Sequence, residues 1–453
     1  MGKKVVIVGY GTAGSAAAAY IKLFCRDCDV TVIEKRPYPV YHPCSIPDCI
    51  SGDIECEKLI EHEPLTKGIE FIASAEVNDV DTSNKVVYFT KEGSKHKMNY
   101  DYLILTTGSK PAVPRVLAHA LEVDKVFTVK NIEDGIAIRK VALQSKEAIV
   151  IGAGAIGLEI ATALKKLGLR VILIEALSKI LPALLDDDVA NYALEKIKAY
   201  GVEVVLNKPV VHVEKHGGKV KVQTKDGSEF VADFAVMAIG LRPNIDLAKK
   251  IGLKIGELGG VVVDEYMRTS IEGIYAAGDV VQVKHLITGK PTLGLFASTA
   301  FKEGRVAGLN VSGIEEKYPG TLIPWLVATE PINIGGVGLS YDQCVREGIK
   351  CTFTAVETLD VEPYEKVVNR VLMKLIVRSD DYRIVGAEVV SKANVARYVD
   401  MLTALIEAGK TVEDIVRLET VYQPKHAALL SPVFVAAEAL YRRYLRIKKR
   451  KKS

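Results

Sequence analysis

Short apolar runs alternate with alanine-rich, helix-like stretches through the first half of the chain. The runs at 4–8 and 148–151 consist mainly of Val, Ile and Ala, which is typical of strands buried on both faces of a sheet. We expect strand, helix and strand over 3–34, antiparallel strands over 69–90 and a buried strand over 100–105. This alternation predicts parallel sheets built from βαβ units.

The pattern changes in the second half of the chain. A long amphipathic helix is predicted near 186–200, and Lys225–Gly227 is typical of a hairpin turn. After residue 321 β-like runs are followed by helices, which indicates a separate α+β module. The other expected elements are a helix within 39–65, a strand within 269–279, a helix over 297–312, β-like segments over 351–356, 371–377 and 383–390, and helices over 393–409 and 431–446.

The predicted fold class is α/β, with two Rossmann-like nucleotide-binding domains and a C-terminal α+β domain. Pro111 and Pro114 mark a linker between the two nucleotide-binding domains. The first of these is expected over 1–112 and 241–320, the second over 113–240, the C-terminal domain over 321–445 and a basic tail over 446–453.

Two glycine-rich fingerprints carry the nucleotide prediction. The first runs from Gly9 to Gly14 and the second from Gly152 to Gly157, both with the spacing G-x-G-x-x-G. Each follows a strand, precedes a helix, and is followed by a second strand that ends in an acid, Glu34 or Glu175. This is the full context that dinucleotide binding requires, so the chain is predicted to hold two nucleotides and transfer electrons between them. Glu175 is followed by Ala-Leu-Ser, without an arginine for a 2′-phosphate, which favours NADH over NADPH.

The composition and charge of the chain limit its expected partners and cellular location. A net charge of +4 gives the body no reason to bind nucleic acid. Eight Lys/Arg lie between Arg442 and Ser453, either as a frayed, solvated terminus or as a site for an anionic partner or membrane surface. No transmembrane or signal segment is evident, which predicts a cytoplasmic protein. Only five glutamines accompany many Lys and Glu, which is typical of thermophiles.

Cys44 is the expected chemical centre, because it lies shortly after Glu34 and before a predicted helix start at Ser45. The seven cysteines are an odd number without a scaffold pattern, which fits a reducing compartment. Cys49 could form a redox dithiol with Cys44 or act as a small buried hydrophobe. The pair Cys25 and Cys28 ends the first Rossmann helix far from the nucleotide, so direct redox exchange is not expected there. A local disulfide is left open as an alternative for a thermophile. No metal site is expected.

Glu34, Cys44, the Thr106–Gly108 turn and the Ala277–Asp279 segment together resemble the FAD/NAD-linked disulfide reductase family. The resemblance covers almost the whole chain and implies FAD at the first fingerprint, NADH at the second and a C-terminal dimerisation domain. It places Asp279 at the FAD ribityl and pyrophosphate, and Glu159 beside the nicotinamide. The cofactor-binding residues it implies are Gly9, Gly11, Thr12, Ala13, Gly14, Glu34, Lys35, Pro43, Val77, Thr106, Thr107, Gly108, Gly278, Asp279, Ala297, Ser298, Thr299, Gly152, Gly154, Ala155, Ile156, Gly157, Glu159, Glu175 and Gly240.

The single cysteine in the Pro43–Pro47 segment is similar to the branch of coenzyme A-disulfide reductases, NADH oxidases and persulfide or polysulfide reductases. In this branch a Tyr-x-Pro segment of the partner subunit completes the site, which implies a homodimer and makes Tyr422 a candidate proton donor or thiolate stabiliser in trans. Substrate contacts are expected from Lys22, Tyr364 and His426.

Three departures from that branch shape the expected function. Thr12 replaces the His of peroxidase and oxidase members, and Ala155 replaces an aromatic lid. The basic residues expected for coenzyme A on the first helix are reduced to Lys22. We therefore expect an NADH-linked, FAD-dependent reductase of persulfide, polysulfide or coenzyme A disulfide that acts through Cys44. The alternatives are an NADH oxidase that reduces oxygen, and a flavoprotein redox sensor or scaffold whose basic tail binds a partner.

Overall fold

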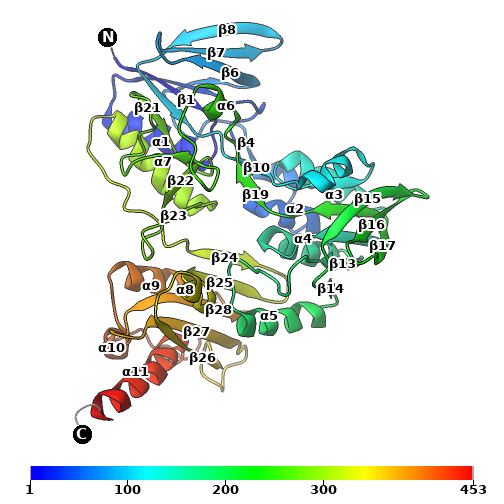
Figure 1. The fold of residues 1–453 in the computed structure, drawn as a ribbon, viewed down its shortest axis with the longest axis vertical. Coiled ribbons are helices and arrows are strands. Elements are labelled where there is room, and N and C mark those ends of the chain that lie inside the picture. Colours follow the sequence, from blue (N-terminus) through cyan, green and yellow to red (C-terminus); the bar gives the residue numbers. More distant parts are fainter. Residues whose placement is uncertain (1, 451–453) are drawn as a thin grey trace. The chain divides into compact units, whose positions relative to one another are not determined.

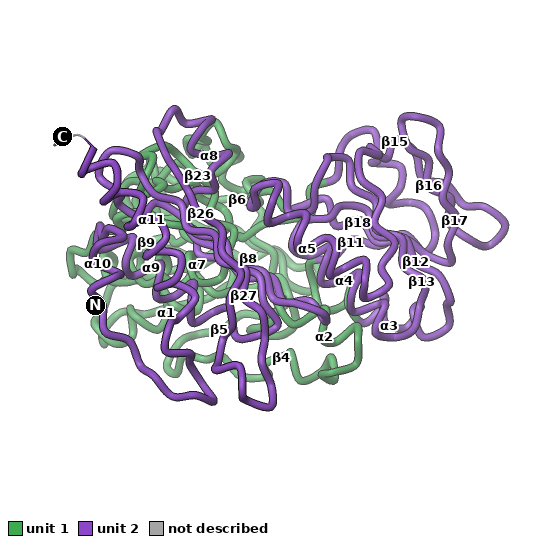
Figure 2. The backbone as a smooth tube through the Cα atoms, turned by 90° about the horizontal axis from the view of Figure 1, so that it is seen from below, with its two compact units in different colours: residues 1–112, 130–135, 241–323 green, residues 113–129, 136–240, 324–453 purple. Residues whose placement is uncertain are grey.

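The computed structural model describes residues 2–450 and divides into two compact units (Figure 2). Unit 1 comprises residues 1–112, 130–135 and 241–323, and unit 2 comprises residues 113–129, 136–240 and 324–453. The short stretch 130–135 belongs to unit 1, although the sequence places it within the second nucleotide-binding domain. Among the described residues, no helix is long and apolar enough to cross a membrane.

Unit 1 is built on a five-stranded parallel sheet with the order β21-β9-β1-β2-β5. The central strand β1 (Lys4–Val8) pairs with β2 (Asp29–Ile33) on one side and with β9 (Tyr102–Leu105) on the other. The connections reverse direction at β1, so its carboxyl end is the topological switch point where open α/β sheets bind ligands. The outer strands are β5 (Glu70–Ile72) and β21 (Ile274–Ala276).

Helices α1 (Thr12–Phe24) and α7 (Ala297–Val311) pack closely together in unit 1. Glycines on α7 make this approach possible, because a Cβ at Gly304 would lie 2.2 Å from the Ala13 carbonyl oxygen. The other elements of unit 1 are the sheet β6 (Ala75–Asp81), β7 (Val86–Lys91) and β8 (Ser94–Asn99), the hairpin partners β10 (Ser109–Pro111) and β19 (Leu241–Pro243), α6 (Asp246–Lys250), β20 (Val261–Val262), β22 (Val281–Lys284) and β23 (Pro291–Thr292).

Unit 2 repeats the parallel arrangement with the order β11-β18-β12-β13-β14. Its central strand β12 (Glu147–Ile151) lies between β13 (Arg170–Ile174) and β18 (Phe234–Met237), and α4 (Ala155–Lys166) follows it. The remaining elements of this part are η3 (Arg115–Glu122), β11 (Val126–Thr128), α3 (Ile132–Ala142), which begins in unit 1, α5 (Asp187–Ala199), β14 (Glu203–Val205) and the antiparallel β15 (Val210–His216), β16 (Lys219–Thr224) and β17 (Glu229–Ala232).

The last part of unit 2 is an antiparallel sheet with the order β24-β25-β28-β27-β26 (Figure 1). Its central strand β28 (Ile384–Ser391) is buried along its whole length. The other elements are β24 (Trp325–Ala328), β25 (Asn333–Gly338), α8 (Tyr341–Arg346), β26 (Cys351–Leu359), β27 (Arg370–Arg378), α9 (Ala396–Glu407), α10 (Val412–Arg417) and α11 (Pro432–Arg450).

The predicted α/β class is confirmed. One expectation about the tail is wrong: helix α11 continues through Arg450, so the basic residues up to that point are helical rather than frayed. Residues 451–453 of the predicted tail lie outside the described residues. The division into three domains stays a prediction.

Candidate functional site

The glycines of the first fingerprint are required for two different reasons, the backbone turn and the approach of a ligand. Gly9 has a φ of +94°, and a Cβ at Gly14 would lie 2.2 Å from the Gly9 carbonyl oxygen, so the turn itself demands both. Gly11, the N-cap of α1, has an ordinary φ of −73°, and no described atom lies within 4 Å of a Cβ added there. Neither backbone strain nor packing within the protein accounts for glycine at Gly11, whereas close approach of a phosphate does.

Glu34 closes the first fingerprint from the neighbouring strand. Its Oε2 accepts a hydrogen bond of 2.7 Å from the Tyr10 amide. Arg36 holds the same carboxylate in a fork, with Nε donating to Oε1 and Nη2 donating to Oε2, both at 2.8 Å. The Arg36 guanidinium also lies over the Tyr41 ring, 4.7 Å from its centroid. Sequence reasoning missed Arg36, although its position two residues after Glu34 was a usable signal.

The second fingerprint has the same geometry. Gly152 has a φ of +102°, and a Cβ at Gly157 would lie 1.9 Å from the Gly152 carbonyl oxygen. Gly154, the N-cap of α4, has nothing within 4 Å of an added Cβ in the described structure. Glu175 Oε2 accepts 2.6 Å from the Ala153 amide, as Glu34 does from Tyr10. The second Glu175 oxygen accepts from the Leu177 amide at 2.9 Å.

These two sites fit dinucleotides. Each helix begins with a glycine N-cap that offers no side-chain acceptor, so the amides of its first turn are left to an external anion. Neither α1 nor α4 carries an acidic residue in that turn. Each site also has a buried glutamate at the end of the adjoining strand, where a ribose would be bound. Glycine and carboxylate positions of this kind can hold a flavin dinucleotide and a pyridine nucleotide.

The Thr106–Gly108 turn lies against the first fingerprint. Thr106 Oγ1 donates to the carbonyl oxygens of Val8 and Gly9, at 3.0 and 2.8 Å, and Thr107 Oγ1 donates to that of Asn244 at 2.8 Å. The predicted turn therefore braces the fingerprint through its side chains, in addition to any contact with a nucleotide.

Asp279 is embedded in a polar network that the sequence did not reveal. Its Oδ2 accepts 2.6 Å from Ser109 Oγ, and Lys130 Nζ lies 2.7 Å from that hydroxyl and 3.6 Å from Asp279 Oδ2. Lys130 is brought to unit 1 by the stretch 130–135. A lysine just before a helix start was the only sequence signal for it.

Cys44 lies in a closed loop that we call the Cys44 loop, residues 40–61. Strands β3 (Val40–Tyr41) and β4 (Ile60–Glu61) pair antiparallel at its base. His42 reinforces this base, because its amide donates to the Leu59 carbonyl oxygen at 3.0 Å and its Nε2 lies 3.0 Å from Glu61 Oε1. Cys44 is exposed in the turn η1 (Pro43–Ser45), directly before α2 (Ile46–Ser51).

The Cys44 loop is cross-linked. Cys49 forms a disulfide with Cys56, at the start of η2 (Cys56–Leu59), and both are buried. The expected redox dithiol of Cys49 with Cys44 is therefore wrong, whereas Cys49 is buried on α2 as the alternative interpretation expected, although that interpretation did not include a disulfide. The reason is geometric: the turn after α2 returns the chain, with the amides of Gly52 and Asp53 donating to the Asp48 carbonyl oxygen, and brings Cys56 to Cys49 with Cα atoms 4.9 Å apart.

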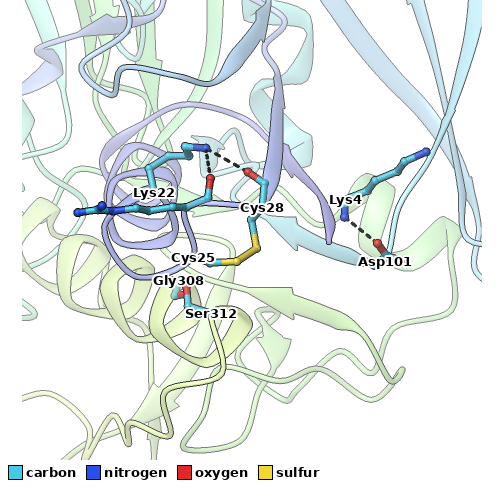
Figure 3. The surroundings of a disulfide bond; sticks show 8 residues. Lys4, Lys22, Cys25, Cys28, Asp101, Gly308 and Ser312 are labelled. Carbon is cyan, nitrogen blue, oxygen red and sulfur yellow. Dashed lines mark hydrogen bonds between the residues drawn. A yellow bond between two sulfur atoms is a disulfide. The ribbon is translucent and has the colours of Figure 1, made fainter. Parts of the chain in front are cut away.

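The Cys25–Cys28 pair also forms a disulfide, which fastens the end of α1 to the start of β2 (Figure 3). Lys22 Nζ donates to the Cys28 carbonyl oxygen at 3.1 Å and to that of Arg26 at 3.4 Å, so its amine caps this turn. Four of the seven cysteines are thus paired, which a fully reduced protein would not show.

Unit 2 contains the other predicted catalytic and substrate residues. Tyr364 and Tyr422 come together and are both exposed, and their hydrogen bond, with burial and nearby carboxylates, raises the pKa of Tyr364 to about 12. His426 is exposed, and its carbonyl oxygen accepts 2.6 Å from Arg397 Nη1. Glu159 lies on α4, and its Oε1 accepts 3.1 Å from the Ala328 amide.

The remaining predicted cofactor residues lie at the starts of α1, α4 and α7 and in several other segments. Thr12 and Ala13 begin α1, Ala155 and Ile156 begin α4, and Ala297, Ser298 and Thr299 begin α7. Lys35 is exposed and pairs with Glu76 at 2.7 Å, Pro43 opens η1, Val77 packs against the core of unit 1, and Gly240 has a φ of +122°. The contacts of these residues with a cofactor stay predictions.

Comparisons with known proteins identify the family. Residues 3–304 match the model for the pyridine nucleotide-disulphide oxidoreductases, and residues 323–431 match the model for their dimerisation domain. The chain is 36% identical over 445 residues to an NADH oxidase of Methanocaldococcus jannaschii, covering 96% of this chain and 98% of that protein. It is 32% identical over 444 residues to a CoA-dependent NAD(P)H sulfur oxidoreductase of Pyrococcus furiosus, covering 97% and 99%.

Among solved structures, an NAD-dependent persulfide reductase from A. fulgidus superposes with a TM-score of 0.93 at 33% identity, covering 97% of this chain and 83% of that one. A water-forming NADH oxidase from Lactobacillus brevis superposes with a TM-score of 0.92 at 27% identity, covering 98% and 99%. The chain therefore belongs to the pyridine nucleotide-disulphide oxidoreductase family, whose members are flavin- and NAD(H)-linked oxidoreductases.

Proposed function

We propose that this protein uses NADH and FAD to reduce persulfide, polysulfide or coenzyme A disulfide through Cys44. The observation that carries the proposal is an exposed Cys44 thiol whose nearest cysteine in sequence, Cys49, is already bonded to Cys56. With Cys49 engaged, the disulfide that Cys44 forms during turnover takes its second sulfur from the substrate. The sulfur reductases among the relatives support this substrate class.

We assign FAD to the first fingerprint and NADH to the second. The first fingerprint shares unit 1 with Cys44 and Asp279, as expected for the cofactor that passes electrons to sulfur. Glu175 supports NADH, because its oxygens accept from two backbone amides and no arginine among residues 2–450 is shown to bind that carboxylate as Arg36 binds Glu34. When bound, the flavin supplies a two-electron link between a hydride donor and a sulfur acceptor.

The proposed reaction at Cys44 consists of one thiol–disulfide exchange and one two-electron reduction, and together these conserve atoms and electrons. The Cys44 thiolate attacks one sulfur of a substrate R–S–S–R, which forms a mixed disulfide and releases one thiolate RS⁻. Two electrons, supplied overall by NADH, cleave the mixed disulfide to the Cys44 thiolate and a second RS⁻. With a persulfide R–S–SH, attack on the inner sulfur forms the same mixed disulfide and releases HS⁻.

The Tyr364–Tyr422 pair is proposed to serve the site of a second subunit. Dimerisation domains of this family support a homodimer, and both tyrosines are exposed and therefore able to reach another chain. In that role Tyr422 donates a proton or a hydrogen bond to the sulfur at Cys44. His426 and Lys22 stay candidate substrate contacts, with the amine of Lys22 held at the end of α1.

A thermophilic setting is part of the proposal. Two disulfides in a protein of this kind agree with it, because intracellular proteins of hyperthermophiles are the exception to the rule of reduced cytosolic thiols. The Methanocaldococcus and Pyrococcus relatives are from thermophiles. The cytoplasmic location stays a prediction.

The test is anaerobic NADH oxidation by Cys44→Ser, with coenzyme A disulfide, a persulfide and polysulfide as separate acceptors. We expect NADH still to bleach the flavin absorbance, while sulfur-dependent turnover falls by at least about 10³-fold because the nucleophile is gone. Cys351→Ser is the matched control, since Cys351 also forms no disulfide but lies on β26 in unit 2. Sulfur reduction that survives in Cys44→Ser would refute the proposal.

An NADH oxidase is the second candidate, because the relative at 36% identity bears that name. Thr12 stands against it, since oxidase and peroxidase members of the resembling branch carry His there. The same assay under air, without a sulfur acceptor, distinguishes the two candidates. Oxygen-dependent NADH turnover at a rate comparable to the sulfur-dependent rate would favour the oxidase.

A further inference from the structure

Glu303 is a buried carboxyl at the junction of the motifs that form the first nucleotide site. It lies on α7 and is 1% exposed. Its Oε2 accepts 2.7 Å from the amide of Gly278, the residue before Asp279. Its Oε1 has no hydrogen-bond partner among residues 2–450. One oxygen of this side chain thus holds the Gly278–Asp279 motif, and the other is buried without a partner among the described residues.

The residue after Glu303 and the glycine that its carboxyl holds both lie against the first turn of α1. A Cβ on the neighbouring Gly304 would lie 2.2 Å from the Ala13 carbonyl oxygen, and a Cβ on Gly278 would lie 2.9 Å from the Ala13 Cβ. Ala13 belongs to the fingerprint turn whose amides are free for a phosphate. A negative charge on Glu303 would therefore lie close to the phosphates of any dinucleotide bound there.

The surroundings favour the neutral acid. Burial raises the pKa of Glu303 well above its ordinary value, the Gly278 amide offsets part of this, and the Asp279 carboxylate raises the pKa further. The cations on the neighbouring helices do not balance a charge on Glu303. Arg305 on α7 pairs with Glu316 at 2.8 Å. Lys22 caps the opposite end of α1. Lys130 is 3.6 Å from Asp279, whose charge it balances. The exposed Lys302 completes the charged groups on the packed elements.

We propose that Glu303 is a positioning residue of the FAD site that works only as an uncharged acid: its carbonyl oxygen fixes Gly278 and thereby Asp279, and its hydroxyl donates to an acceptor of the bound nucleotide or to a water that the nucleotide orders. A protonated carboxyl has one acceptor oxygen and one donor, which matches one oxygen that already accepts and one that lacks a partner. The proposal rests on the assignment of FAD to the first fingerprint.

Proton uptake then accompanies FAD binding at pH values where Glu303 is ionised in the free protein. The bound phosphates add negative charge beside Glu303, so the complex holds its proton up to a higher pH than the free protein does. At a pH between the pKa of Glu303 in the free protein and its higher pKa in the complex, the complex carries one more proton than the free protein. FAD affinity therefore falls as pH rises, by up to about tenfold for each pH unit.

The experiment measures FAD affinity of the full-length protein, stripped of flavin and reconstituted, from about pH 6 to about pH 10, by the fluorescence of released FAD. We expect the wild-type affinity to fall with pH, and the affinity of Glu303→Gln to stay flat and within about threefold of the wild type at the acidic end. Glu388→Gln is the matched control: Glu388 is also a buried glutamate whose burial raises its pKa well above normal, but it lies in unit 2. This control should keep the wild-type slope.

Calorimetry of FAD binding to the wild type, in two buffers with different ionisation enthalpies, counts the protons directly and does not depend on any variant folding. Uptake approaching one proton at any pH within the range supports the proposal, and no uptake across the range overturns it. A Glu303→Gln protein that keeps the wild-type slope also overturns it. A wild-type protein that binds no FAD at any pH would instead refute the assignment of FAD.

Discussion

Replacing Gly11 and Gly14 by alanine separates the demands of the nucleotide from those of the fold. The two glycines are three residues apart in one fingerprint, yet their surroundings differ. A Cβ at Gly14 would lie 2.2 Å from the Gly9 carbonyl oxygen and 2.8 Å from Thr106 Oγ1, so α1 or its turn has to shift. A Cβ at Gly11 meets no described atom within 4 Å, and φ of −73° is open to alanine.

The magnitudes follow from these contacts. Gly14→Ala forces an overpacked methyl group against backbone, which costs roughly 3 kcal/mol or more of unfolding free energy. Gly11→Ala loses only the small N-cap preference for glycine over alanine, below about 1 kcal/mol. The Gly11 methyl group instead stands where a pyrophosphate approaches, and a clash of about 1–3 kcal/mol there weakens FAD binding by roughly 5- to 150-fold.

The assay pairs chemical denaturation of the flavin-free protein with FAD titration for both variants. Gly11→Ala should be nearly as stable as the wild type and bind FAD poorly, whereas Gly14→Ala should be clearly destabilised before any ligand is added. If Gly11→Ala binds FAD with wild-type affinity, the nucleotide does not approach α1 as its open N-terminus indicates, and the basis for assigning a dinucleotide to this turn fails.

Three further outcomes are expected. Gly154→Ala, with the same open surroundings, should weaken NADH binding while leaving FAD affinity unchanged in the same titrations. Cys56→Ser should lower the unfolding free energy by about 2.5 kcal/mol, the loop-closure value for the Cys49–Cys56 loop, and a reductant should erase the difference from wild type in denaturation curves. Lys374→Met should cost about 3–5 kcal/mol by the same measurement, because it leaves the buried carboxylate of Asp186, 2.9 Å from Lys374 Nζ, without its cation; a loss below about 1 kcal/mol would show that the pair contributes little.

The sequence was most informative where hydrophobic periodicity and burial agree. Strands buried on both faces, such as β1 and β12, appear as apolar runs that periodicity detects directly. The edge strand β8 escaped detection because its sequence, SKHKMN, is polar and its side chains are largely exposed. Strand β25 escaped for the opposite reason, since its buried centre contains Gly335 and Gly336. A Cβ at Gly335 would lie 2.8 Å from Val395 Cγ1, so glycine there permits close packing and does not mark a loop.

Parts of the candidate site depend on contacts between distant segments, which no local pattern specifies. The fingerprints with their acids were recognisable because each residue has a fixed place in a βαβ unit. Lys130 reaches Ser109 across 21 residues, and Glu303 reaches Gly278 across 25, in each case through the packing of separate elements. The Cys49–Cys56 disulfide was equally hidden, because cysteine spacing does not determine pairing.

That disulfide bears directly on how many electrons the site can store in sulfur. A Cys44–Cys49 dithiol would let the protein keep two electrons without substrate. Here the buried Cys49 is held to Cys56 by a turn in which the Asp48 carbonyl oxygen accepts from three backbone amides, so exchange with Cys44 would require this part of the loop to open. Under the proposed function Cys44 therefore accepts two electrons only after it has formed a mixed disulfide or persulfide with substrate, and these electrons cleave that bond. The acceptor must then be a molecule that can reach the exposed Cys44 thiol. Because Cys49 is bonded to Cys56, the loop favours a substrate that supplies the second sulfur of the disulfide.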